Sequence, residues 1–82
     1  MKVRVLFFAA TRDLAGTSEA TLTVPGTAPT VGDFVRHLEA TYPELSGRMG
    51  TVRVAQNERF TKLEAPLAEG DVLALIPPVS GG

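Results

Sequence analysis

A single amphipathic helix dominates the sequence pattern and is predicted from Val31 to about Tyr42. Thr30 is well placed as its N-cap, and Asp33, three residues on, gives the pattern of a capping box with a negative charge in the first turn. Pro43 bars the helix from continuing. One apolar stripe recurs at helical spacing: Val31, Phe34, Val35, Leu38 and Tyr42. A helix with one such stripe is expected to pack on one face of one sheet.

Short strand-like segments lie on both sides of this helix. Residues 2–9 and 19–24 alternate with period two, and their short connection favours an antiparallel hairpin. After the helix, residues 51–55 and 72–76 are predicted strands, and residues 59–61 are a predicted short edge strand. This order is the plan of a β-grasp, or ubiquitin-like, domain. We therefore expect an α+β fold, with a mixed sheet of four to five strands and one main helix on one face.

The connections carry the usual turn residues. Residues 10–16 are predicted to form a loop or a single turn that ends at Gly16, a natural site for positive φ. Residues 43–50 are expected to be irregular, with room for one short turn of helix. Gln56-Asn57-Glu58 is a predicted turn, and residues 62–70 are a predicted loop anchored by Leu67.

Composition and charge exclude several classes of function. A chain of 82 residues that is 44% hydrophobic forms one domain with one modest core. It has no cysteine, which removes thiolate nucleophiles, disulfides and cysteine-ligated metals. The net charge of −1 has no basic stripe, so we expect no nucleic-acid partner. No apolar run is long enough for a membrane span or a signal peptide, so a cytoplasmic location without membrane contact is expected.

A conventional active site finds little support in the sequence. His37 is the only histidine, and it lies in mid-helix with no motif serine near it, as an ordinary helix residue would. The carboxylates of Glu64, Glu69 and Asp71 fall in loops or turns and are interpreted as solvated charge. Metal binding fails on the number of ligands, and the glycines match no phosphate-binding fingerprint. We expect no bound metal and no bound cofactor.

The end of the chain carries the strongest functional signal. We divide the chain into a domain over residues 1–76 and an extended tail over residues 77–82, whose sequence is Pro77-Pro78-Val79-Ser80-Gly81-Gly82. The two prolines stiffen the tail and lower its entropy loss on insertion. Glycines have no Cβ and pass through a narrow channel. ATP can activate a terminal carboxylate as an acyl-adenylate, so we expect the tail to enter a partner enzyme; the alternative is an ordinary frayed end.

The sequence resembles the MoaD/ThiS family of ubiquitin-like sulfur carriers, in particular the small subunit of molybdopterin synthase. Thiamine-pathway members of the family share the two glycines but are usually shorter and lack the double proline. The resemblance is spread over the whole chain, and its last segment is the most specific. It rests on three segments: Val5-Leu6-Phe7-Phe8-Ala9 with Arg12 and Gly16, Thr30 through Leu38, and Glu69 through Gly82.

The resemblance implies a function in molybdenum cofactor biosynthesis. An adenylating enzyme related to ubiquitin-activating enzymes would use MgATP to activate the carboxylate of Gly82, and a sulfur donor would convert it to a thiocarboxylate. Gly81 and the proline stem would deliver this group into the large subunit of molybdopterin synthase, a heterotetramer in this family. There it would give sulfur to cyclic pyranopterin monophosphate. The chain would then be a sulfur-carrier subunit and no enzyme on its own.

A docking surface is expected beside the tail. By strand parity, Leu6 and Phe8 share a face at the end of the first strand, and Ile76 precedes the tail. We predict an exposed apolar patch of Phe8, Phe60 and Ile76 that binds the large subunit, with Arg12 nearby for polar contacts. Phe60 lies where the resemblance is looser. The tail residues expected to bind the partner are Pro77, Pro78, Val79 and Ser80.

Three alternatives remain open at this point. The same fold and tail suit a protein modifier that forms isopeptide bonds with lysine. They also suit a sulfur carrier for another recipient, in thiamine, cysteine or tRNA thiolation. A purely structural β-grasp module with a frayed end is the third.

Overall fold

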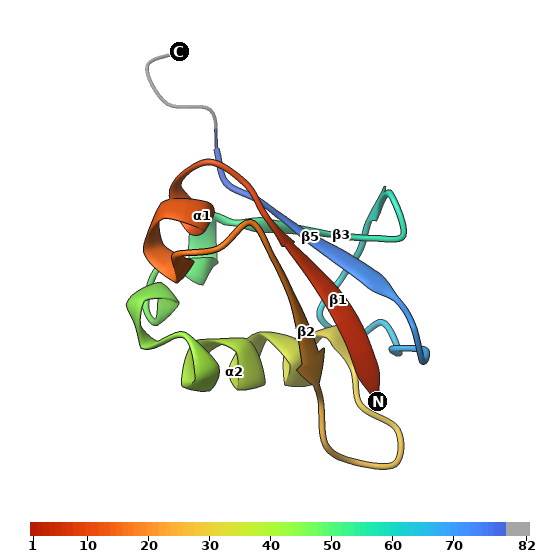
Figure 1. Cartoon of the computed structure of the whole chain (residues 1–82). Helices are drawn as coiled ribbons and strands as arrows, with labels where there is room; N and C mark the ends of the chain where they lie inside the picture. Colours follow the sequence, from red (N-terminus) through yellow and green to blue (C-terminus); the bar gives the residue numbers. More distant parts are fainter. Residues whose placement is uncertain (79–82) are drawn as a thin grey trace.

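A computed structural model of the chain describes residues 1–78. One sheet runs in the order β2-β1-β5-β3-β4 and contains β1 (Lys2–Phe7), β2 (Glu19–Thr23), β3 (Arg53–Gln56), β4 (Arg59–Phe60) and β5 (Val72–Ile76) (Figure 1). The central strands β1 and β5 are parallel, and every other neighbouring pair is antiparallel. The predicted mixed sheet and the first hairpin are confirmed. Because β1 and β5 are parallel neighbours, their C-terminal ends lie at the same end of the sheet. The residues that follow the two strands therefore leave the sheet side by side.

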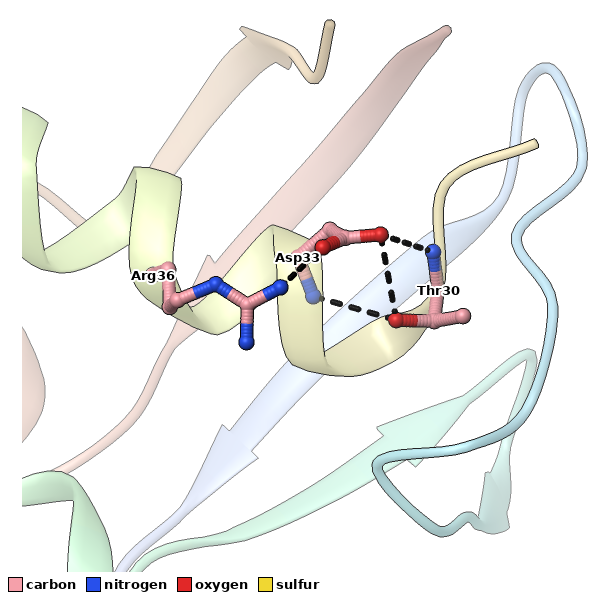
Figure 2. A network of polar contacts seen from close by, with 3 residues as sticks. All are labelled: Thr30, Asp33 and Arg36. Carbon is pink, nitrogen blue, oxygen red and sulfur yellow. Dashed lines mark hydrogen bonds and ion pairs between the residues drawn. The ribbon is translucent and has the colours of Figure 1, made fainter. Parts of the chain in front are cut away.

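One helix, α2 (Val31–Thr41), crosses one face of the sheet, as predicted (Figure 1). Its first turn is closed by a capping box (Figure 2). The Asp33 N–H donates to Thr30 Oγ1 at 3.2 Å, and the Thr30 N–H donates to Asp33 Oδ2 at 2.8 Å. Arg36 forms an ion pair with the same carboxylate. The backbone hydrogen bond from Thr30 is the main reason that the pKa of Asp33 lies below its ordinary 3.8.

The core lies between α2 and the sheet face that it covers. β1 and β5 supply Val3, Val5 and Phe7, and Leu73 and Leu75, at alternate positions. The α2 stripe meets them with Val31, Phe34 and Leu38 fully buried and with Val35 and Tyr42 partly buried. Leu67 is buried and anchors the loop before β5, as predicted. Within residues 1–78, no helix covers the other sheet face, which we call the open face (Figure 1).

The segment after β1 differs from the prediction. Instead of a loop or a single turn, residues Ala10–Ala15 form a short helix, α1. The chain turns at Ala9, where φ is 51°, so β1 ends at Phe7 rather than at Ala9. Thr11 is buried, and its hydroxyl donates to the Phe8 carbonyl oxygen at 2.6 Å and accepts from the Phe8 N–H at 3.0 Å. Gly16 ends the helix with φ of 78°, as its position suggested.

The connection after α2 contains two short 3₁₀ turns, η1 (Pro43–Leu45) and η2 (Met49–Thr51), where an irregular segment with one turn was predicted. Because η2 takes up Thr51, β3 begins at Arg53, two residues later than predicted. The turn between β3 and β4 consists of Asn57 and Glu58, with φ of 52° and 71°. Positive φ at both central residues is the geometry of a two-residue hairpin. β4 lies at the sheet edge, as predicted.

A buried carboxylate ties this turn to the start of β5. Asp71 is 6% exposed, and its oxygens accept from Gln56 Nε2 at 2.8 Å, Asn57 Nδ2 at 2.9 Å and the Ala68 N–H at 2.8 Å. Asn57 Oδ1 in turn accepts from the Val72 N–H at 2.9 Å. Asp71, which the sequence suggested to be solvated, is therefore a structural residue.

Candidate functional site

The stem of the predicted tail leaves the middle of the sheet. β5 ends at Ile76, Pro77 is half-buried and Pro78 is exposed. The remaining tail residues named above, Val79, Ser80, Gly81 and Gly82, lie outside the described part of the chain, and their roles stay predictions. So does the division into a domain over residues 1–76 and a tail over residues 77–82. The observed geometry sets the origin of the tail, next to the end of β1.

Strand register places two of the predicted docking residues together. Phe7 on β1 is the partner of Leu75 on β5, so the next residues, Phe8 and Ile76, are neighbours at the C-terminal ends of these two strands. Phe8 is 46% exposed, and Ile76 is half-buried on the open face. An apolar pair therefore stands where the tail begins.

Phe60 lies on the same face but at the β4 edge. One transverse row of partners runs across the open face: Leu6 with Ala74, Ala74 with Ala55, and Ala55 with Phe60. This row joins Phe60, 55% exposed, to the strand that ends in the tail. We call Leu6, Phe8, Phe60, Ala74 and Ile76 the apolar patch; the buried Ala55 lies between Ala74 and Phe60.

One cationic side chain contacts the patch. The guanidinium carbon of Arg53 lies 3.6 Å from the centroid of the Phe60 ring, which is a cation–π contact. Arg53 is not among the residues predicted from the sequence, because its contact with Phe60 depends on the register of β3 and β4. Arg12 is exposed on α1, and its side chain forms no hydrogen bond or ion pair with residues 1–78. The structure thus leaves the predicted role of Arg12 as a prediction.

The remaining titratable groups do not form a catalytic cluster within residues 1–78. No three His, Cys, Asp or Glu residues of this range are grouped as metal ligands. His37 is half-buried on α2 and borders a shallow cavity with Asp33 and Arg36, away from the tail. Burial raises the pKa of Asp71, but hydrogen bonds from Asn57, Gln56 and the Ala68 N–H together hold it below its ordinary 3.8. The lowered pKa values of Asp33 and Asp71 are therefore both explained by hydrogen bonds that stabilise the fold.

Residues 5–82 of the chain match the ThiS family. The chain belongs to the ThiS family. It is 36% identical over 84 residues to the molybdopterin synthase sulfur carrier subunit of Chlamydomonas reinhardtii, with all of both chains covered. These findings confirm the family resemblance.

Solved structures of ThiS-like carriers have the same fold. Small archaeal modifier protein 1 (SAMP1) of Haloferax volcanii matches with a TM-score of 0.91, 32% identity and full coverage of both chains. A protein–protein complex of subunits 1 and 2 of the molybdopterin-converting factor from Helicobacter pylori matches with a TM-score of 0.69 and 28% identity, again over both whole chains. The predicted β-grasp fold is confirmed. In residues 1–78, the helices are too short and too polar to cross a bilayer.

Proposed function

We propose that this ThiS-family chain is the sulfur-carrier subunit of molybdopterin synthase, and that Gly82 carries the sulfur as a thiocarboxylate. The full-length likeness to a protein of that name is the observation that supports this most directly. The fold supports it as well, because the tail stem continues the central strand β5 and so has a rigid origin. Nothing in residues 1–78 resembles a catalytic centre, which suits a carrier whose chemistry is done by other chains.

The proposed reaction sequence has three steps. An adenylating enzyme lets a Gly82 carboxylate oxygen attack the α-phosphate of MgATP, which releases pyrophosphate and leaves an acyl-adenylate. A donor of sulfide-level sulfur, such as HS⁻, then attacks the acyl carbon of the adenylate and AMP leaves, so that the Gly82 acyl group becomes a thiocarboxylate. The large subunit finally transfers this sulfur to cyclic pyranopterin monophosphate. ATP is thus consumed by the partner, and the carrier binds no cofactor; a cytoplasmic location is part of this proposal.

The apolar patch supplies the docking surface for the large subunit in this proposal. A complex of the two subunits exists for the Helicobacter pylori relative. In our chain Phe8 and Ile76 stand at the tail exit, so a partner that covers them also receives the tail. Phe60 widens the contact toward β4, and Arg12 is assigned polar contacts beside Phe8. Large, exposed aromatic side chains are the kind of residue that dominates binding energy at interfaces.

A mass measurement tests the proposal. The purified chain is incubated with the adenylating enzyme, MgATP and a sulfur donor, and its intact mass is recorded. The expected product has one oxygen replaced by sulfur, and a variant lacking Gly82 remains unmodified. A wild-type chain that stays unmodified under conditions in which a known carrier reacts would contradict the assignment.

A second function, protein modification, is favoured by the likeness to small archaeal modifier protein 1. The same activated Gly82 carboxylate would then be attacked by a lysine amine instead of a sulfur donor. The two functions separate in the same reaction. Lysine-linked conjugates without thiocarboxylate would favour the modifier, whereas thiocarboxylate alone favours the carrier.

A further inference from the structure

Two surface cavities adjoin each other on the side of the sheet that α2 covers. The first has a volume of about 270 Å³ and lies between α1, η2 and the tail stem, with Pro77 and Pro78 in its wall. The second has a volume of about 330 Å³ and extends along β3 to Lys62 and Leu63. Both are lined by Met49 and Val52, so they share a wall, and we call the two neighbouring cavities together the η2 groove. It begins at the tail stem, where Pro77 and Pro78 line it.

Apolar side chains line both ends of the η2 groove among the polar ones, and we call these apolar side chains its floor. Leu14 and Met49 line the end near the tail, and Val54 and Leu63 line the far end. Leu63 is 58% exposed and lies outside the apolar patch, so the proposed docking surface does not account for it. An apolar floor of this kind accepts aliphatic side chains from an extended segment.

The charges around the groove are all of one sign. Its lining residues include Arg48, Arg53 and Lys62 and no acidic residue, although the whole chain has a net charge of −1. The Arg53 guanidinium lies over Phe60 on the open face, so Arg48 and Lys62 are the cations of the groove itself. Neither forms an ion pair within residues 1–78, where Arg4 pairs with Glu19 and Arg36 with Asp33. An occupant with carboxylates would therefore be complementary.

The groove and the apolar patch flank the same tail. Val31, Leu45, Met49 and Val54 of the groove belong to the core under α2, whereas the patch lies on the open face. A protein that holds the tail can thus contact the carrier on both sides of the stem. Contact on two sides fixes the direction in which the stem enters the partner better than contact on one side.

We propose that the η2 groove binds an extended acidic segment of the synthase large subunit, in which aliphatic side chains alternate with Asp or Glu. The aliphatic side chains occupy the Leu14–Met49–Leu63 floor, and the carboxylates pair with Arg48 and Lys62. This inference rests on the proposed function, because it takes the large subunit as the protein that receives the tail. It adds a second docking surface, on the side of the sheet opposite the apolar patch.

Charge reversal with a matched control tests the groove. The double variant Arg48→Glu/Lys62→Glu is compared with Lys2→Glu/Arg59→Glu, which makes the same change in net charge at exposed positions outside the groove. Kd for the purified large subunit is measured by calorimetry at low and at high salt. At low salt, we expect the double variant in the groove to bind the large subunit about tenfold more weakly than the control double variant. The difference between their Kd values should shrink as the salt concentration rises.

The outcomes separate this inference from the proposed function. If the wild-type chain does not bind the large subunit, the proposed function fails and the inference fails with it. If the wild type binds and the two doubles have equal Kd values, the inference alone is overturned. A loss of binding to the adenylating enzyme, with binding to the large subunit unchanged, would also overturn it.

A crosslinking measurement provides a readout independent of charge reversal. A photoreactive benzoylphenylalanine replaces Thr51, an exposed residue in the groove wall, and in a control chain it replaces Thr23 on β2. The Thr51 probe should crosslink to a large-subunit peptide rich in Asp and Glu, and the Thr23 probe should not. Crosslinks from Thr51 to a second copy of the chain, in place of the large subunit, would contradict the assigned occupant.

Discussion

The Asp71 carboxylate shows how one residue supports the strand that carries the tail. Its three hydrogen bonds reach Gln56 at the end of β3, Asn57 in the following turn and Ala68 in the loop before β5. Asn57 also accepts from the first N–H of β5. Two segments of the chain, residues 56–57 and residues 68–72, thus meet at a single buried charge, at the opposite end of β5 from the one where the tail leaves.

The low pKa of Asp71 makes stability depend on pH. A group whose pKa is lower in the folded state stabilises the fold fully above its unfolded value, here 3.8, and this contribution is lost as pH falls through the folded pKa. Asp71→Ala should lower the free energy of unfolding by about 1–3 kcal/mol at neutral pH, because it leaves buried donors unpaired. Urea unfolding from pH 7 to pH 3 measures this. Asp13→Ala on exposed α1 is the control, and an equal response of both variants would refute the explanation.

Phe8 tests the docking surface at the level of a single side chain. It is 46% exposed, so Phe8→Ala should change the free energy of unfolding little. The affinity of the Phe8→Ala variant for the large subunit should fall about tenfold, because truncation of a central aromatic side chain removes a large share of the binding free energy at an interface. Calorimetric titration gives Kd, with Thr21→Ala, exposed on β2, as the control. Unchanged Kd in Phe8→Ala would remove Phe8 from the interface.

Among the helices and strands, α2 owes its stability most clearly to its own sequence, through its N-terminal cap and its apolar stripe. Its eleven residues form too short a helix to be stable alone, so the cap and the packed stripe have to hold it together. The capping box satisfies the N–H groups of Thr30 and Asp33 (Figure 2). Arg36, in the next turn, adds an exposed ion pair with Asp33, which contributes less.

Thr30→Ala should lower the free energy of unfolding by about 1 kcal/mol, because the first turn of α2 loses its side-chain acceptor. The matched control is Thr27→Ala, an exposed threonine in the loop before the helix. Thermal and urea unfolding of both variants provide the comparison. If both lose the same stability, the capping box would not be what stabilises the start of α2.

The elements also show what the sequence could predict. The α2 signals lie within a dozen consecutive residues, so the helix, its cap and its buried face were predicted correctly. The α1 helix has six residues, less than two turns, and it displays no periodicity from which to predict it. Strand ends shifted where η2 and the positive φ at Ala9 break the extended backbone. The alternation of polar and apolar residues does not indicate where the extended backbone of a strand is interrupted in this way.

The candidate site was predictable only in part, for a related reason. Strand alternation put Leu6 and Phe8 on one face, but only the parallel β1–β5 pairing places Phe8 beside Ile76. The contact between Arg53 and Phe60 depends on the register of β3 and β4 across their turn. The Asp71 network joins residues up to fifteen positions apart, and a charged turn residue was therefore misinterpreted as solvated.

At the scale of the whole molecule, the fold is a rigid base for the tail. The central parallel pair fixes where the stem begins, the apolar patch lies on one side of it and the η2 groove on the other. In this account the carrier presents an activated terminus, and partner proteins recognise the surfaces around it.

Single-turnover sulfur transfer tests that account most directly. The thiocarboxylated chain, freed of ATP and sulfur donor, is mixed with the large subunit and cyclic pyranopterin monophosphate, and carrier mass and pterin product are followed together. The account predicts that the carrier returns to its carboxylate mass as molybdopterin appears, with two carriers consumed for each dithiolene formed. A thiocarboxylate that persists beside bound large subunit, with no pterin product, would contradict it.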